Sequence, residues 1–228
     1  MITGLERIAQ NKLKYPESKH LNLIHYVNVE NLKGAYKRIN GKKATGTDKV
    51  SKDEYGKDLE ANLNQLVARM KTFSYRPQPT KRVYIPKAGS NKLRPLGIPS
   101  FEDKLVQNIM ADVLSEIYEP IFYDFSYGFR KDRDCHKAIE HLSEMIHRNK
   151  VNYIVDADIK GFFDNVDHKI LMEFLRKEIG DDVFLRYIIR FLKAGIMEHG
   201  KKIESDKNIP QGGLISPVLG NVYIYYAL

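Results

Sequence analysis

The sequence of 228 residues predicts an α+β protein that is rich in helix and carries one basic β-hairpin. Three observations support this class. Helix-capping residues stand in front of several segments whose apolar residues recur at helical spacing. Residues 82–98 alternate between apolar and polar side chains instead, and the helices and strands do not follow the regular βαβ order of a parallel sheet. A hydrophobic fraction of 43%, with 14 tyrosines and 10 phenylalanines, is sufficient for a folded core.

Capping signals place the helices of the first part of the chain. Thr3 and Ser51 each stand three residues before a glutamate, which predicts helices that begin near residues 4 and 52, the second extending to about residue 71. Asn28 is expected to cap a helix that ends at Gly41. Residues 41–48, rich in glycine and lysine, are expected to form a loop.

The alternating segment predicts a hairpin, and helices dominate after it. Residues 82–85 and 93–98 form the arms of the expected hairpin, with Pro95 making the second arm an edge or irregular strand. The remaining expected elements are a helix from Ser100 to Pro120, a helix over 137–148 capped by Asp134, a strand over 152–159, helices capped by Asp167 and Asp182 that end at Gly180 and Gly195, a small hairpin within 196–209, and a last helix over 217–228 that is capped by Ser216 and has Pro217 at its first position.

The positive charge is concentrated in one part of the chain. The formal net charge is +8, and residues 69–104 alone carry +7 because nine Lys or Arg residues face only Glu102 and Asp103. Such an excess favours a polyanionic partner such as a nucleic acid. Composition alone leaves a solvated basic face as the alternative.

The cysteine count and the lack of an evident secretory or membrane segment indicate an intracellular protein. Cys135 is the single cysteine, so no internal disulfide can form, as in a reducing compartment. No secretory segment is evident, and no uncharged apolar stretch reaches the roughly 18 residues that a membrane span requires. We therefore expect a cytoplasmic protein, bacterial or organellar, with no membrane partner.

Two carboxylates in the expected strand 152–159 suggest a metal site. Residues two apart share one face of a strand, so Asp156 and Asp158 would point the same way while Val155, Ala157 and Ile159 pack into the core. Mg²⁺ is commonly held by one or two carboxylates together with substrate phosphates. The alternative is that both are ordinary strand-end acids that face water.

The stretch 153–164 (YIVDADIKGFFD) resembles the first catalytic motif of reverse transcriptases, in the form found in group II intron maturases. Five motifs similar to that family stand in the family's order over about residues 33–228. The others are 44–51 (ATGTDKVS), 75–77 (YRP) with 85–87 (IPK) and 92–99 (KLRPLGIP), 126–130 (SYGFR) with His136, Ala138 and Ile139, and 210–217 (PQGGLISP).

The resemblance implies the fingers and an incomplete palm of a right-hand polymerase. It divides the chain into an N-terminal extension (1–50), fingers (51–150) and a partial palm (151–228). The family's second catalytic motif, Tyr-Ala-Asp-Asp, would lie beyond Leu228, so we expect the 228 residues to be a fragment that does not polymerise by itself. An apolar last helix without a cap is expected to be covered by a second copy of the chain or to be loosely ordered, and of these we favour a homodimer at high concentration.

The resemblance also assigns roles to single residues. Asp158 would bind two Mg²⁺ ions in the full-length enzyme, with at most weak binding in the fragment, and the Ile159 carbonyl would complete one of the two sites. Asp156 is the second choice for this metal-binding role, after Asp158. The remaining assignments are Lys87 and Arg94 on the triphosphate, Phe163 against the 2′-hydroxyl, Gln211 on the nucleotide sugar, Gly212 and Gly213 on the template, and Lys12, Lys14, Lys42, Lys43, Arg76, Lys81 and Arg82 on RNA.

Structural alternatives to these assignments remain open. Lys87 and Arg94 would otherwise be surface charge, Phe163 a core aromatic, and residues 210–213 a plain turn before a helix. The predicted function is an RNA-directed DNA polymerase and splicing maturase of a group II intron, whose partners are intron RNA, an RNA template with a DNA primer, and dNTPs. Alternatives are an RNA-binding splicing cofactor that does not polymerise, and a retron-like bacterial reverse transcriptase.

Overall fold

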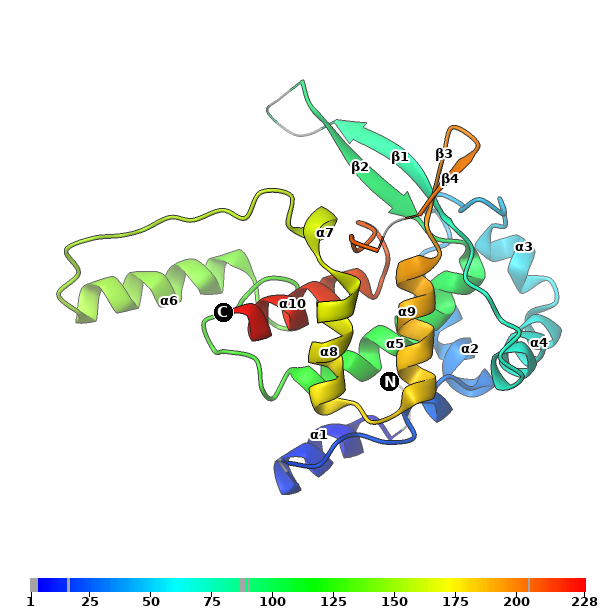
Figure 1. Ribbon diagram of the computed structural model, residues 1–228, viewed down its shortest axis with the longest axis horizontal. Coiled ribbons are helices and arrows are strands. Elements are labelled where there is room, and N and C mark those ends of the chain that lie inside the picture. Colours follow the sequence, from blue (N-terminus) through cyan, green and yellow to red (C-terminus); the bar gives the residue numbers. More distant parts are fainter. Residues whose placement is uncertain (1–3, 16, 87–88, 90, 205) are drawn as a thin grey trace.

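The computed structural model describes residues 4–15, 17–86, 89, 91–204 and 206–228. Helix α5 (Phe101–Tyr118) passes through the middle of the molecule, with α1, α2 and α10 in contact with it (Figure 1). Its larger apolar residues from Leu105 to Ile117 are fully buried, which makes it the centre of the core. The other helices among the described residues are α1 (Glu6–Lys14), a 3₁₀ helix (Leu23–Tyr26), α2 (Val29–Arg38), α3 (Lys52–Gly56), α4 (Leu59–Lys71), α6 (Cys135–Arg148), α7 (Phe162–Asn165), α8 (His168–Glu178), α9 (Asp182–Lys193) and α10 (Ser216–Ala227).

The strands form one small sheet in the order β2-β1-β3-β4. The predicted hairpin is confirmed as β1 (Thr80–Pro86) and β2 (Leu93–Ile98), and β2 is the edge strand that Pro95 predicts. The predicted small hairpin is also confirmed, as β3 (Ile196–Glu198) and β4 (Lys201–Ile203). A feature beyond the prediction is that β3 pairs in parallel with the start of β1, so the two hairpins share one sheet.

The predicted caps are largely confirmed. The side chains of Asn28, Ser51, Ser100 and Asp134 each accept a hydrogen bond from the backbone N–H three residues later. Asp167 caps α8 in the same manner. Thr3 lies outside the described residues. The cap predicted at Ser216 is wrong, because Ser216 is the first residue of α10 and its hydroxyl donates to the Pro210 carbonyl instead.

Three helix boundaries differ from the predictions. The helix after Asn28 ends at Arg38, and the helix expected from residue 52 to 71 is broken into α3 and α4. At the break, the Asn62 side-chain amide donates to the Tyr55 carbonyl at 2.9 Å and satisfies one acceptor at the end of α3. The cap of α9 is Asp181 rather than Asp182, because the buried Asp181 carboxylate accepts from the N–H groups of Val183 and Phe184.

The strand predicted over residues 152–159 is wrong. Residues 151–159 run as an extended segment without strand pairing, and Figure 1 shows this segment and α6 projecting away from the main body. Tyr153 is 90% and Val155 89% exposed, and Ile159 is exposed as well, so the expected core packing is absent. The physical reason is that no described strand lies beside the segment. Its backbone N–H and C=O groups therefore lack strand partners and are left to hydrogen-bond with water.

The apolar surface left open lies on α6 rather than on the last helix. Helix α6 has no buried residues, and its Ile139, Leu142 and Met145 are exposed. In α10, by contrast, Val222 is fully buried and Tyr223, Tyr225 and Tyr226 pack against the core. The expectation of an open apolar face at the chain's last helix is thus corrected to α6. Among the described residues, no helix has the length and apolar character needed to cross a membrane.

Candidate functional site

The two candidate metal ligands lie on the exposed extended segment. Asp156 and Asp158 are both exposed, and neither has a hydrogen bond or ion pair with another described residue. The segment enters α7 through Gly161, whose φ of +61° favours glycine. The side-chain amide of Asn165 donates to the Gly161 carbonyl at 2.9 Å and fixes this turn.

These carboxylates suit Mg²⁺ only as an open site. Unpaired carboxylate oxygens are the hard ligands that Mg²⁺ prefers, and substrate phosphates complete such a site. Within the described ranges, no three His, Cys, Asp or Glu side chains come together as a metal-binding group. Among these groups, the carboxylates of Asp158 and Asp156 and the Ile159 carbonyl supply oxygen atoms of the kind that such an open site uses.

Phe163 has one side on the core and one side partly open. Its ring lies 5.1 Å from that of Phe162 and 6.4 Å from that of Phe129, both edge to face. The backbone of α10 packs on it at Gly220, where a Cβ atom would lie 3.0 Å from the Phe163 ring. The ring is thus held on three sides, which fixes where its partly exposed edge points.

Backbone hydrogen bonds hold the 210–213 loop beside α7 and β2. The Ile209 N–H donates to the Phe163 carbonyl at 2.8 Å, and the Gly97 N–H donates to the Gln211 carbonyl. The Ser216 hydroxyl closes the loop by donating to the Pro210 carbonyl at 2.7 Å. Gln211 lines a narrow pocket together with Arg82 and Asp164. The structure therefore brings the first motif, the 210–217 block and one basic residue of β1 to one place.

Gly212 and Gly213 have a packing role that the sequence did not indicate. Gly212 has φ of +107°, and a Cβ there would overlap the Gly97 carbonyl oxygen and approach Leu96 to 2.9 Å. A Cβ at Gly213 would lie 2.7 Å from the Ser216 hydroxyl oxygen. Both positions thus allow the loop to approach its neighbours closely, whether or not a template also contacts them.

A cavity of about 590 Å³ opens next to this loop. It lies between the end of α2, residues 39–44, β2, α5 and residues 212–214. Lys43 and Lys104 supply positive charge to its lining, whereas the Arg38 guanidinium is paired with the Asp112 carboxylate at 2.7 Å. Burial lowers the pKa of Lys104, Lys43 lowers it further, and Asp48 partly offsets both effects. Two residues expected to touch RNA, Lys43 and Gly212, thus share one basic cavity.

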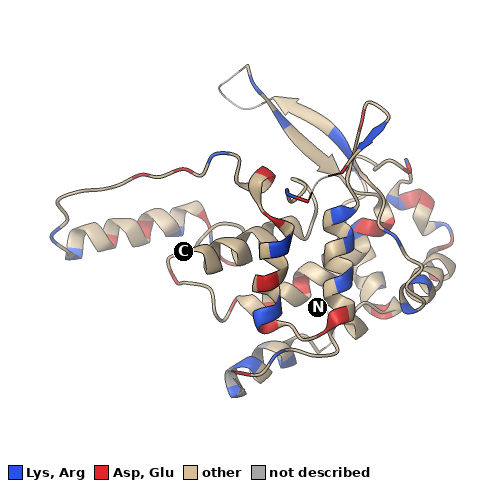
Figure 2. Cartoon of the chain, in the orientation of Figure 1, with Lys and Arg blue, Asp and Glu red and all other residues tan. Residues whose placement is uncertain are grey.

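The other basic candidates differ in their exposure and in their ion pairs. Arg94 is exposed on β2 opposite Ile85, near the tip of the hairpin, whereas Lys87 lies outside the described residues. Arg82 lies 3.8 Å from the Glu198 carboxylate. The Lys12 side chain is only 11% exposed and is paired with Glu178, so it offers little to a phosphate. The candidates with exposed side chains are Lys14, Lys42, Lys43, Arg76 and Lys81, and Figure 2 shows the spread of basic residues over the molecule.

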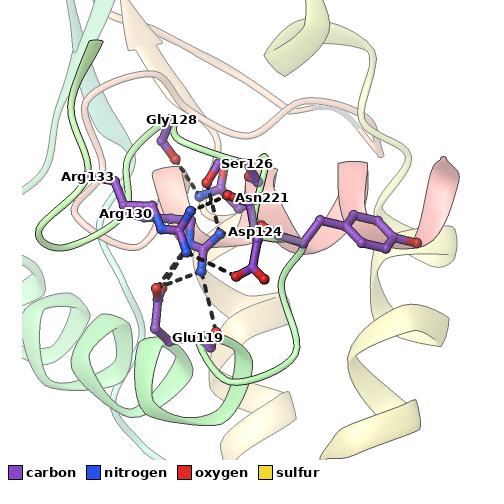
Figure 3. A network of polar contacts seen from close by, with 8 residues as sticks. Glu119, Asp124, Ser126, Gly128, Arg130, Arg133 and Asn221 are labelled. Carbon is purple, nitrogen blue, oxygen red and sulfur yellow. Dashed lines mark hydrogen bonds and ion pairs between the residues drawn. The ribbon is translucent and has the colours of Figure 1, made fainter. Parts of the chain in front are cut away.

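Arg130 is a positioning residue whose role could not be inferred from the sequence. Its guanidinium is 3% exposed and donates to both Glu119 carboxylate oxygens, at 3.1 and 2.7 Å, and to the carbonyls of Tyr123 and Ser126 (Figure 3). These bonds fix the loop that places Phe129 beside Phe163. The loop is tied to α10 as well, because Asn221 donates to the Gly128 carbonyl at 2.8 Å. The SYGFR motif contains this arginine, but its buried network depends on tertiary packing.

Comparisons with known proteins show which proteins this chain resembles. A family model described as "Reverse transcriptase (RNA-dependent DNA polymerase)" matches residues 85–228, more than half of the chain. The chain is 36% identical over 222 residues to the Group II intron-encoded protein LtrA of Lactococcus lactis, covering 97% of this chain and 37% of that protein. It is 35% identical over 187 residues to the protein YkfC of Escherichia coli, covering 81% of this chain and 49% of that one.

A yeast protein and a solved complex extend these findings. The Putative COX1/OXI3 intron 1 protein of Saccharomyces cerevisiae is 31% identical over 208 residues, covering 90% of this chain and 25% of the relative. The chain thus spans less than half the length of these relatives. A chain of the Cas6-RT-Cas1--Cas2 complex has the same fold, with a TM-score of 0.58 and 20% identity over 90% of this chain and 21% of that one.

Proposed function

Because the chain belongs to the reverse transcriptase family, we propose that it supplies the fingers and part of the palm of an RNA-directed DNA polymerase that also acts as a group II intron maturase. One observation carries the proposal most. The hydrogen bond from Ile209 to the Phe163 carbonyl joins the first motif to the residue directly before the 210–217 block, beside Arg82 and the 590 Å³ cavity. A nucleotide site and a template path need these groups on one side of the protein.

Each group has a role in this proposal. Asp158, with Asp156 and the Ile159 carbonyl, would hold Mg²⁺, which supplies Lewis-acid activation and charge neutralisation in phosphoryl transfer. Arg94 on β2, together with Lys87, would hold the triphosphate of a dNTP. The half-buried ring of Phe163 would exclude a 2′-hydroxyl, and Gln211 would hydrogen-bond to the sugar. Gly212, Gly213 and the basic cavity would receive the template.

We propose three regions with boundaries at residues 50 and 150, although one continuous core includes residues from all of them, such as Leu32, Leu105 and Leu171. A homodimer in the cytoplasm is the proposed state, because the exposed apolar face of α6 suits a covering protein surface. A second candidate function is intron-RNA binding that promotes splicing without polymerisation. Residues 151–159, which carry Asp156 and Asp158, pair with no described strand, so no neighbouring strand holds these carboxylates in a fixed position. This observation supports RNA binding without polymerisation by these 228 residues.

Salt-dependent RNA binding tests both candidates at once. The exposed lysines and arginines should neutralise several phosphates, so the logarithm of the binding constant should fall linearly with the logarithm of salt concentration, by about 0.7 per phosphate contact. Fluorescence anisotropy with a labelled RNA hairpin measures this slope, and a titration with sucrose in place of salt is the control. An affinity that barely changes between low and moderate salt would contradict RNA binding through contacts between these basic residues and phosphates.

A further inference from the structure

Three arginines meet on a surface formed by α9 and the chain between α4 and β1. Arg76 and Arg190 each donate a hydrogen bond to the carbonyl of Tyr75, both at 3.1 Å, so their guanidinium groups share one acceptor. Arg186 stands one turn before Arg190 on α9, and its guanidinium lies 4.5 Å from the centre of the Phe73 ring. Arg76 and Arg186 are exposed and Arg190 is half-buried.

No acidic side chain neutralises this cluster in the part of the chain that the structure describes. The carboxylates at the start of α9 are engaged elsewhere, since Asp181 caps the helix and Asp182 pairs with Arg176 at 2.8 Å. Asp103 accepts from the Tyr75 hydroxyl and from the Gln78 N–H. Like charges at this spacing repel one another, so the arrangement costs free energy until an anion arrives.

The scaffold under the cluster is rigid. Tyr75 is buried, and its hydroxyl donates to the Asp103 carboxylate, whose pKa burial raises to about 6 while hydrogen bonds from Tyr75, Ser100 and Gln78 partly offset the rise. The Tyr187 hydroxyl donates to the Met70 carbonyl at 2.7 Å. Phe73 has φ of +58°, a left-handed conformation that is rare for a bulky residue. Strain of this kind is typical of functional positions, and here it places the ring under Arg186.

All three charges act on one hydroxyl group. Burial raises the pKa of Tyr187, and Arg190, Arg76 and Arg186 each oppose that rise. The effect of all three arginines on the pKa of Tyr187 agrees with the hydrogen bonds to the Tyr75 carbonyl and the contact with the Phe73 ring, which also bring the three guanidinium groups together. Figure 2 shows the corresponding basic bands along α9.

We propose that Arg76, Arg186 and Arg190 bind the phosphodiester backbone of structured RNA. Planar guanidinium groups suit bidentate contacts with phosphate oxygens, and several of them on an open surface suit an extended polyanion better than a single small anion. In Figure 1, the chain between α4 and β1 lies on the opposite side of α9 from α7. The cluster is therefore a second RNA contact, apart from Phe163 and Gln211. This inference rests on the proposed function.

The experiment compares two double variants that remove the same charge. R76Q/R186Q weakens the cluster and leaves the half-buried Arg190 in place. K33Q/R176Q removes two exposed cations that are paired with Glu60 and Asp182. R76K/R186K keeps the positive charge but replaces each guanidinium group by an ammonium group, which cannot make bidentate contacts with a phosphate. Each is titrated with a labelled RNA hairpin over a range of salt concentrations, after a thermal melt has compared its stability with that of the wild type.

R76Q/R186Q should bind roughly 25-fold more weakly than the wild type at about 0.1 M salt, with a log–log slope less negative by about 1.4. R76K/R186K should keep the wild-type slope, and K33Q/R176Q should stay within about threefold of the wild type. The inference is overturned if R76Q/R186Q and K33Q/R176Q bind alike, or if polyglutamate displaces RNA as well as unlabelled RNA does. If the wild type and K33Q/R176Q do not bind RNA at all, the proposed function fails as well.

Discussion

Replacing Asp158 by alanine in the full-length protein is expected to reduce RNA-templated nucleotide addition by about a thousandfold or more. The carboxylate is the first choice for holding the metal ions of phosphoryl transfer, and a loss of this size corresponds to roughly 4 kcal/mol in the activation barrier. Asp158 is exposed and makes no hydrogen bond or ion pair to other described residues, so its removal should leave the fold intact. RNA affinity should therefore remain near that of the wild type.

Asp156 is the matched control for this experiment, because it lies on the same exposed segment two residues away. Asp156→Ala should lower the rate less than Asp158→Ala does. Single-turnover primer extension with saturating dNTP and Mg²⁺ measures both variants. A larger loss for Asp156→Ala would exchange the roles of the two carboxylates.

Replacing Phe163 by valine is expected to admit ribonucleotides while largely preserving the use of deoxynucleotides. The ring is held by Phe162, Phe129 and the backbone at Gly220, so it cannot swing away from a 2′-hydroxyl. Replacing the Phe163 ring by the smaller valine side chain opens space for the 2′-hydroxyl. Because steric discrimination by a pocket wall is commonly worth 10- to 200-fold, selectivity for dNTP over rNTP should fall by about that factor.

Phe162→Val provides the control for Phe163→Val. Phe162 packs against Phe163 and against Tyr223 of α10, so its truncation should lower stability without altering sugar selectivity. The ratio of kcat/KM for dNTP and rNTP is the measurement, with thermal melts for stability. An unchanged ratio in Phe163→Val would return Phe163 to the role of a core aromatic.

Local signals predicted much of the fold, because they act over four residues or fewer. Ser100 caps α5 and Asn28 caps α2 as their sequence positions indicate, and Pro95 lies on an edge strand. The parallel pairing of β1 with β3 could not be predicted, since Thr80 and Ile196 are joined only by the tertiary fold. The strand expected at 152–159 failed for a related reason: its side-chain alternation is present, but no neighbouring strand pairs with it.

The candidate site shows the same division between local and tertiary information. The motif residues Phe163 and Gln211 could be predicted from the sequence, and the structure brings their backbones together through Ile209 and Gly97. The sequence predicts an RNA contact for Arg76, but its grouping with Arg186 and Arg190 could not be predicted, nor could the clamp at Arg130. Their members are recognisable only when burial, a shared carbonyl acceptor and the absence of nearby described carboxylates are known.

RNA-templated primer extension by the full-length protein tests the central claim most directly. The reaction contains an RNA template, an annealed DNA primer, dNTPs and Mg²⁺, and a parallel reaction contains excess chelator. We predict extension to the end of the template that the chelator abolishes. Tight, salt-dependent RNA binding without any extension would contradict the polymerase assignment and favour the splicing cofactor.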